Sequence, residues 1–117
     1  MAGTPQDTHA EPAPVGFTTA RLAAIDLAKE IPSLDGRFVR LSHTSIRPGG
    51  GFDWHSHAGK PEIIYVLEGT LSEGRGDAEI AHGPGSVLQM TDGVRHSLAN
   101  RTDAPVVYLS ISVRKLT

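Results

Sequence analysis

Aliphatic and polar side chains alternate near the C-terminal end of the chain, which makes this its clearest predicted strand. One face of that segment carries four aliphatic side chains, and the opposite face carries a tyrosine and two serines. The first set is Val107, Leu109, Ile111 and Val113, and the second is Tyr108, Ser110 and Ser112. Because successive side chains of a strand point to opposite sides of a sheet, the pattern predicts a strand with one buried face and one solvated face.

Several shorter segments of extended character precede it, each bounded by turn residues. Residues 37–47 favour a strand that ends at the run Pro48-Gly49-Gly50-Gly51. Residues 62–67 and 70–73 form a predicted hairpin. Three further short strands are predicted at residues 78–81, 86–90 and 95–100. Short strands separated by Gly-rich and Pro-rich turns at this spacing are typical of an all-β antiparallel sandwich or barrel.

The N-terminal segment has a different composition. Residues 1–19 are rich in Ala, Pro, Thr and Gly and carry few large apolar side chains, so they bury too little apolar surface to compensate the entropy of ordering. We therefore expect a flexible arm over residues 1–19 and a single barrel domain over residues 20–117, without a second domain or an internal repeat. Residues 20–31 predict either a short helix or an edge strand that Pro32 limits.

Charge balance and the absence of cysteine narrow the possible functions. Lys and Arg number 11, Asp and Glu number 13, and the basic residues are scattered along the chain, so we expect neither a nucleic-acid partner nor a membrane partner. The first twenty residues lack the pattern of a signal peptide, and no apolar run approaches the roughly 20 residues that span a bilayer. We therefore expect a cytoplasmic protein. Without cysteine, any metal must be held by His, Asp, Glu or carbonyl oxygens.

Three histidines and one glutamate are spaced so that their side chains can meet. His55 and His57 are separated by one residue, which in an extended chain puts both imidazoles on one face, about 6.6 Å apart along the backbone. Glu62 opens the next predicted strand, and His96 arrives from a later one. Three imidazoles and a carboxylate suit Fe, Mn, Co, Ni, Cu or Zn rather than Mg or Ca. We predict one divalent transition metal, bound by His55, His57, Glu62 and His96.

Two motifs that contain these residues resemble those of the cupin family. The first is similar at its full spacing, through Gly49, His55-Ser-His57, Glu62 and Gly69. The second is similar through Gly85, Gly93, His96 and Asn100, although Thr91 stands where the family usually has a proline. The resemblance implies a jelly-roll barrel of six or more antiparallel strands with its metal ligands pointing inward. It also implies a homodimer, in which the N-terminal arm could add a strand to the neighbouring subunit.

Sites of this kind in the cupin family serve dioxygenases, decarboxylases, isomerases, lyases and cyclases. Four protein ligands on an octahedral ion leave two adjacent positions for dioxygen or for a chelating oxygen pair of a small metabolite. We therefore expect a metal-dependent oxidoreductase of the dioxygenase type that acts on a small, oxygen-rich substrate. Two alternatives remain open: an oxygen-independent isomerase, cyclase or lyase, and a non-catalytic module that binds a metal and a small metabolite.

Further candidate residues follow from the register of the ligands. Glu62 is the one carboxylate obviously placed for proton transfer, so it is the candidate catalytic residue as well as a ligand. Gln89 and His43 are the candidate substrate-binding residues, with solvent exposure and simple packing as their respective alternatives. His82 lies in a predicted turn and is expected to be exposed. An apolar cavity wall is predicted from the inward register of Ile64, Val66 and Leu98.

Overall fold

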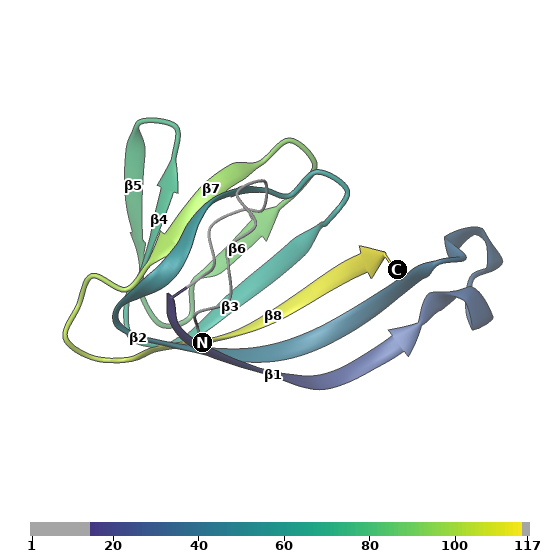
Figure 1. Cartoon of the computed structure of the whole chain (residues 1–117), viewed down its shortest axis with the longest axis horizontal. Helices are drawn as coiled ribbons and strands as arrows, with labels where there is room; N and C mark the ends of the chain where they lie inside the picture. The colour runs from purple at the N-terminus through teal and green to yellow at the C-terminus, as the bar shows by residue number, and fades with distance from the viewer. Residues whose placement is uncertain (1–14, 116–117) are drawn as a thin grey trace, which may run out of the picture.

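The structure, a computed structural model, describes residues 15–115 as a nearly closed antiparallel barrel of jelly-roll type (Figure 1). Its elements, in chain order, are β1 (Val15–Asp26), η1 (Leu27–Lys29), η2 (Pro32–Leu34), β2 (Arg37–Ser56), β3 (Glu62–Glu68), β4 (Leu71–Arg75), β5 (Ala78–His82), β6 (Val87–Met90), β7 (Arg95–Ala99) and β8 (Val106–Lys115). Hydrogen-bonded strands follow the order β5-β4-β7-β2-β8-β3-β6, and β1 pairs with β2 outside this path. The all-β antiparallel fold predicted from the sequence is confirmed. Within residues 15–115, no helix is long and apolar enough to cross a membrane.

The long strand β2 joins the two layers of the barrel. Its first half pairs with β8 and with β1, and its last residues, from Gly51 to Ser56, pair with β7. The change of neighbour follows the Pro-Gly run, where Gly49 has a φ of +82°, a conformation that glycine adopts without strain. At Gly51 a side chain would collide with the carbonyl oxygen of Leu98 on β7. The run therefore bends the strand, whereas the sequence predicted that it would end there.

Strand β1 lies along the first half of β2, which pairs with β8 on its other side, and the connection from β1 to β2 lies at the far end of these strands (Figure 1). It begins at Val15, five residues before the predicted start of the barrel domain; residues 1–14 of the predicted arm lie outside the described residues. The segment predicted as a helix or an edge strand contains both kinds of element, β1 and then η1. The helix begins where it does because the carboxylate of Asp26 accepts a hydrogen bond from the backbone N–H of Ala28 at 3.1 Å.

Inward side chains on β2, β8 and β3 form rows across the sheet. The first row is Arg40, Ser112 and Glu62; the second is Ser42, Ser110 and Ile64; the third is Thr44, Tyr108 and Val66. The next pair is Ile46 with Val106, both fully buried in the apolar core. Polarity therefore decreases along the interior, from charged residues at one end to the apolar core at the other. The predicted inward register of Ile64, Val66 and Leu98 is confirmed, since each is at most 5% exposed.

The interior face of β8 is its polar face. Tyr108, Ser110 and Ser112 are buried, whereas Ile111 on the opposite face is 48% exposed. A rule based on hydrophobicity alone would bury the aliphatic face. The polar face points inward because it lines a cavity, which contains the candidate functional site.

Candidate metal centre

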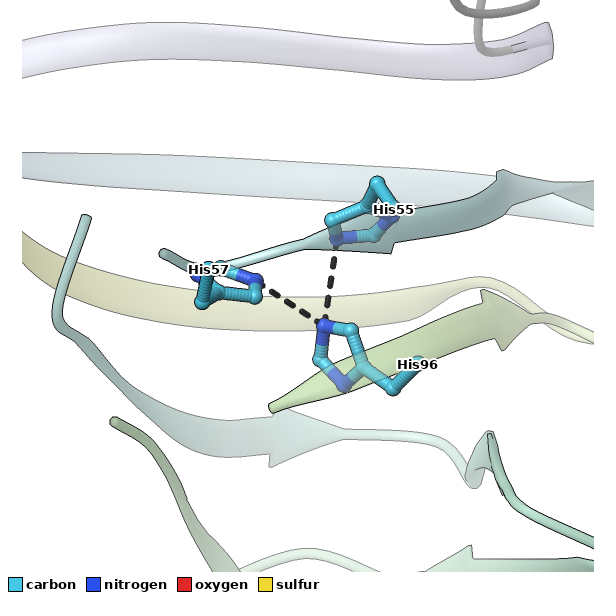
Figure 2. A group of neighbouring side chains, drawn as sticks. All are labelled: His55, His57 and His96. Carbon is cyan, nitrogen blue, oxygen red and sulfur yellow. Dashed lines mark hydrogen bonds between the residues drawn. The ribbon is translucent and has the colours of Figure 1, made fainter. Parts of the chain in front are cut away.

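Three histidines from two neighbouring segments bring their imidazole rings together (Figure 2). His55 lies on β2 opposite His96 of β7, and His57 follows directly after the end of β2. The Nε2 atom of His96 is 3.0 Å from Nε2 of His57 and 3.1 Å from Nε2 of His55. His96 is fully buried, and His57 is 4% exposed. Three of the four predicted ligands therefore converge on one point.

The hydrogen bond made by Nδ1 of each ring determines which ring nitrogen carries the hydrogen. Nδ1 of His55 lies 2.7 Å from the backbone oxygen of Asp53, and Nδ1 of His57 lies 3.0 Å from that of Lys60. Carbonyl oxygens only accept hydrogen bonds, so both Nδ1 atoms carry the hydrogen. Nδ1 of His96 lies 2.7 Å from a carboxylate oxygen of Glu73. In the neutral rings, all three Nε2 atoms therefore present lone pairs to one another.

This arrangement fits a metal ion. Lone pairs about 3 Å apart repel each other unless a cation lies between them. Two nitrogens on one ion, with bonds of about 2.0–2.1 Å, are about 2.9 Å apart at a right angle and about 3.4 Å apart at the tetrahedral angle. The observed separations of 3.0 and 3.1 Å lie in this range. Imidazole donors suit Zn, Cu, Fe or Ni, and also Mn or Co when oxygen ligands complete the site.

Glu62 is near the three histidines but outside their group. One oxygen of its carboxylate lies 3.9 Å from Nδ1 of His57, and the same oxygen accepts a hydrogen bond from Arg114 at 3.2 Å. The atoms that converge within 4.8 Å of one another come from His55, His57 and His96. The structure therefore places the predicted fourth ligand and catalytic residue in the same cavity, where it is paired with an arginine.

A second carboxylate, Glu73 of β4, was missed by the sequence reasoning. It is 2% exposed and accepts hydrogen bonds from Nδ1 of His96 at 2.7 Å, Nε2 of His82 at 2.9 Å and Nε of Arg75 at 2.7 Å. Burial by itself would raise the pKa of Glu73, but these three hydrogen bonds outweigh it and lower the pKa below its ordinary value. Glu73 therefore orients the ring of His96 as an ionised carboxylate.

The signal for Glu73 lies in the alternation along β4. Leu71 is fully buried, so Glu73 falls on the same inward face. His82, which was expected to be exposed in a turn, instead ends β5 with its side chain only 18% exposed, because the ring reaches Glu73.

Burial also suppresses protonation of His96 and His57. The pKa of His96 is lowered to about 4, mainly by burial and further by His55 and His57, although the hydrogen bond to Glu73 opposes the shift. Burial likewise lowers the pKa of His57, against the opposing effect of the Lys60 carbonyl. Both rings are therefore neutral at pH 7, as metal ligation requires.

The histidines border a cavity of about 340 Å³, at the lower end of the size range for small-molecule sites. Two apolar side chains, Phe52 and Ile64, form part of its wall. The polar side chains include Arg40, Ser42, Thr44, Glu62, Tyr108, Ser110 and Arg114. The wall is therefore less apolar than predicted. Burial raises the pKa of Tyr108, which keeps its phenol neutral.

The two predicted substrate-binding residues lie outside the lining of this cavity. His43 is on β2 between Ser42 and Thr44, which face inward, so the alternation of the strand turns His43 to the opposite side. Gln89 is an exposed residue of β6 and borders a separate hollow with Ile63 and Ile111 on the outer surface. Neither side chain shares a pocket with the three histidines.

Known proteins resemble the chain in sequence and fold. Residues 42–112 match the family profile of the cupin domain. An auxin-binding protein from Prunus persica is 25% identical over 85 residues, which cover 68% of this chain and 41% of that protein. The chain spans less than half the length of the curated relatives that it matches. A polyketide cyclase from Streptomyces resistomycificus has a similar fold, with a TM-score of 0.69, 23% identity, and coverage of 92% of this chain and 75% of that one. A predicted oxalate decarboxylase from Thermotoga maritima also has a similar fold, with a TM-score of 0.67 and 18% identity. The match covers 96% of this chain and 97% of that one.

Proposed function

Because this chain belongs to the cupin domain family, we propose that it is a metal-dependent enzyme that acts on a small, oxygen-rich metabolite. The convergence of three Nε2 lone pairs at the wall of a ligand-sized cavity carries this proposal. His55, His57 and His96 would hold the ion, and the carboxylate of Glu62 lies beside them, 3.9 Å from Nδ1 of His57. A divalent transition ion held there would polarise a substrate oxygen and, if redox-active, would supply dioxygen chemistry.

Glu62 supplies the acid–base chemistry. Its carboxylate lines the cavity and accepts a hydrogen bond from Arg114 at 3.2 Å. In this position Glu62 would accept a proton from a substrate hydroxyl or carbon acid. The neutral phenol of Tyr108 and the hydroxyl of Ser110 lie on the same wall and are available to hydrogen-bond a substrate oxygen.

We favour oxidation of the dioxygenase type. Three histidine ligands would leave room on an ion for both substrate and dioxygen, and the apolar core beyond the Tyr108 row limits access of water from that end. Small molecules that present a chelating oxygen pair, such as enediols, diketones and phenols, are the first compounds to test.

An oxygen-independent cyclisation or isomerisation is the second candidate. Glu62 favours it, because a carboxylate outside the group of three histidines is free to move protons on a substrate that the ion polarises. The fold neighbour from Streptomyces resistomycificus is a polyketide cyclase, which agrees with this candidate at the level of the fold.

Oxygen uptake separates the two candidates. Protein is loaded anaerobically with Fe²⁺ in one sample and with Zn²⁺ in another, and each is offered diketones, enediols and phenols in an oxygen electrode. Uptake that requires Fe²⁺ and is lost in His96→Ala supports dioxygenase chemistry. Product formation without oxygen, in either metal form, supports the second candidate. Metal binding without turnover of any compound contradicts both and leaves a binding module.

A further inference from the structure

Two arginines lie together at the polar end of the cavity. Arg40 of β2 and Arg114 of β8 both line it, and the Nε atom of each donates a hydrogen bond of 3.3 Å to the hydroxyl oxygen of Ser112. Ser112 is 2% exposed and pairs with Arg40 across the sheet. The shared hydroxyl therefore holds both guanidinium groups beside each other.

The two guanidinium groups differ in how their charge is balanced. Arg114 donates to the carboxylate of Glu62 at 3.2 Å. Arg40 forms no ion pair with a carboxylate within residues 15–115. Burial lowers its pKa, and the nearby Arg114 and Arg21 lower it further, although the more distant charge of Glu62 opposes the shift. Like charges held together in a partly buried site are unfavourable unless an anion joins them. The two arginines together with Glu62 thus carry one net positive charge.

Hydroxyl groups line the cavity wall between the two arginines and Tyr108. Ser42 and Ser110 face each other across β2 and β8, one row inward from Arg40. Thr44 and Tyr108 form the following row. All four side chains line the cavity that the three histidines border. A ligand in this cavity would therefore contact the arginines, a set of hydroxyl groups and the metal-binding histidines.

We propose that the substrate carries a carboxylate group that binds to Arg40 and Arg114, with its remaining oxygens directed toward the three histidines. This inference rests on the proposed function, because it names the substrate of that same cavity. A guanidinium group matches a carboxylate with two parallel hydrogen bonds. In the metal-free protein, a monoanion balances the one charge that Glu62 leaves uncompensated on the arginine pair, whereas a phosphate dianion would exceed it. The substrate class is therefore a small hydroxy or oxo carboxylic acid.

Binding of matched small molecules tests this assignment. Pyruvate, its uncharged methyl ester and inorganic phosphate are titrated calorimetrically into metal-free protein and into Zn²⁺-loaded protein. We expect pyruvate to bind more tightly than the other two compounds. In Arg40→Gln the dissociation constant of pyruvate should increase about tenfold or more, the range for loss of a charge-assisted hydrogen bond. Arg101→Gln is the matched control, because Arg101 pairs with Glu79 on the surface.

The outcomes separate this inference from the proposed function. Arg40-dependent binding of pyruvate to a protein that takes up no metal supports the carboxylate site and contradicts the metal enzyme. Metal uptake with equal pyruvate affinity in wild type and Arg40→Gln overturns the carboxylate site alone. Tighter binding of phosphate than of pyruvate, or equal binding of pyruvate and its methyl ester to wild type, overturns it as well. The comparison of pyruvate with its ester needs no variant, so it decides the question even if Arg40→Gln does not fold.

Discussion

Replacing Glu73 with glutamine tests whether a buried carboxylate positions a metal ligand. The side chain keeps its size but loses its charge, and its single carbonyl oxygen replaces a carboxylate that accepts three hydrogen bonds. The hydrogen bond from Nδ1 of His96, at 2.7 Å, loses its charged acceptor. Because such partners fix the orientation and basicity of a ligating imidazole, their loss weakens metal binding by about 10-fold to 100-fold, or about 1.4 to 2.7 kcal/mol.

The same substitution should also destabilise the metal-free protein. The glutamine carbonyl accepts fewer hydrogen bonds, so at least one of the donors on His96, His82 and Arg75 loses its acceptor. The ring of His96 is fully buried, whereas the side chains of His82 and Arg75 are 18% and 36% exposed. Leaving one buried donor unpaired costs about 1–3 kcal/mol. Urea denaturation of metal-free protein measures this cost, and competition with a chelator for Co²⁺ measures the metal affinity.

Glu79→Gln is the matched control, because Glu79 forms a surface ion pair with Arg101. We expect it to bind Co²⁺ with the affinity of wild type. The reasoning is refuted if Glu73→Gln folds with the circular dichroism spectrum of wild type and binds Co²⁺ within about twofold of the wild-type affinity. Destabilisation without any change in metal affinity would make Glu73 a structural residue only.

Two further predictions concern stability. Burial lowers the pKa of His96 to about 4, so in metal-free protein the unfolded chain takes up a proton there at a higher pH than the folded chain does. The free energy of unfolding should therefore fall by about 3 kcal/mol as the pH drops from about 6.5 to 4. Urea unfolding at several pH values measures this change, and a constant free energy across that interval would contradict it. Gly69→Ala should lower the melting temperature more than Gly59→Ala. Both glycines have a positive φ, so each substitution strains the backbone. A side chain at Gly69 would also collide with the carbonyl oxygen of Pro105, whereas one at Gly59 meets open space. Equal melting temperatures for the two variants would rule out the close approach.

The sequence predicted the type of fold and the group of histidines because both depend on local spacing. The separation of His55 and His57 by one residue puts both rings on one side of an extended segment, and the turn before His96 returns β7 to the same place. The inward register of Ile64 and Leu98 followed from that of the ligands beside them. Alternation along a strand was sufficient for each of these predictions.

Other features depend on which face of a strand meets the cavity, and hydrophobicity does not determine this. The polar face of β8 points inward because Tyr108 and Ser110 line the cavity. His43 was a candidate only if it shared the cavity face, and the register of β2 gives that face to Ser42 and Thr44. The site depends on pairings between strands that are distant in sequence, such as β2 with β8, which spacing along the chain does not specify.

Glu73 and Glu62 illustrate the same difference at the metal centre. Glu62 was predicted from motif spacing, which specifies its place in the chain but not the partner of its carboxylate, Arg114. Glu73 belongs to neither motif, and its contact with His96 arises because β4 pairs with β7. A glutamate in register with a buried leucine was the available signal.

Metal binding to purified protein is the most direct test of the central claim that His55, His57 and His96 form one metal site. Equilibrium dialysis against Co²⁺, followed by elemental analysis, should give one ion per chain for wild type. His43→Ala should match wild type because its side chain lies outside the cavity, while His96→Ala should retain no ion at the same concentration of free metal. A wild-type protein that retains no Co²⁺, Zn²⁺, Fe²⁺, Mn²⁺, Ni²⁺ or Cu²⁺, or a His96→Ala variant that binds as well as His43→Ala, would contradict the account.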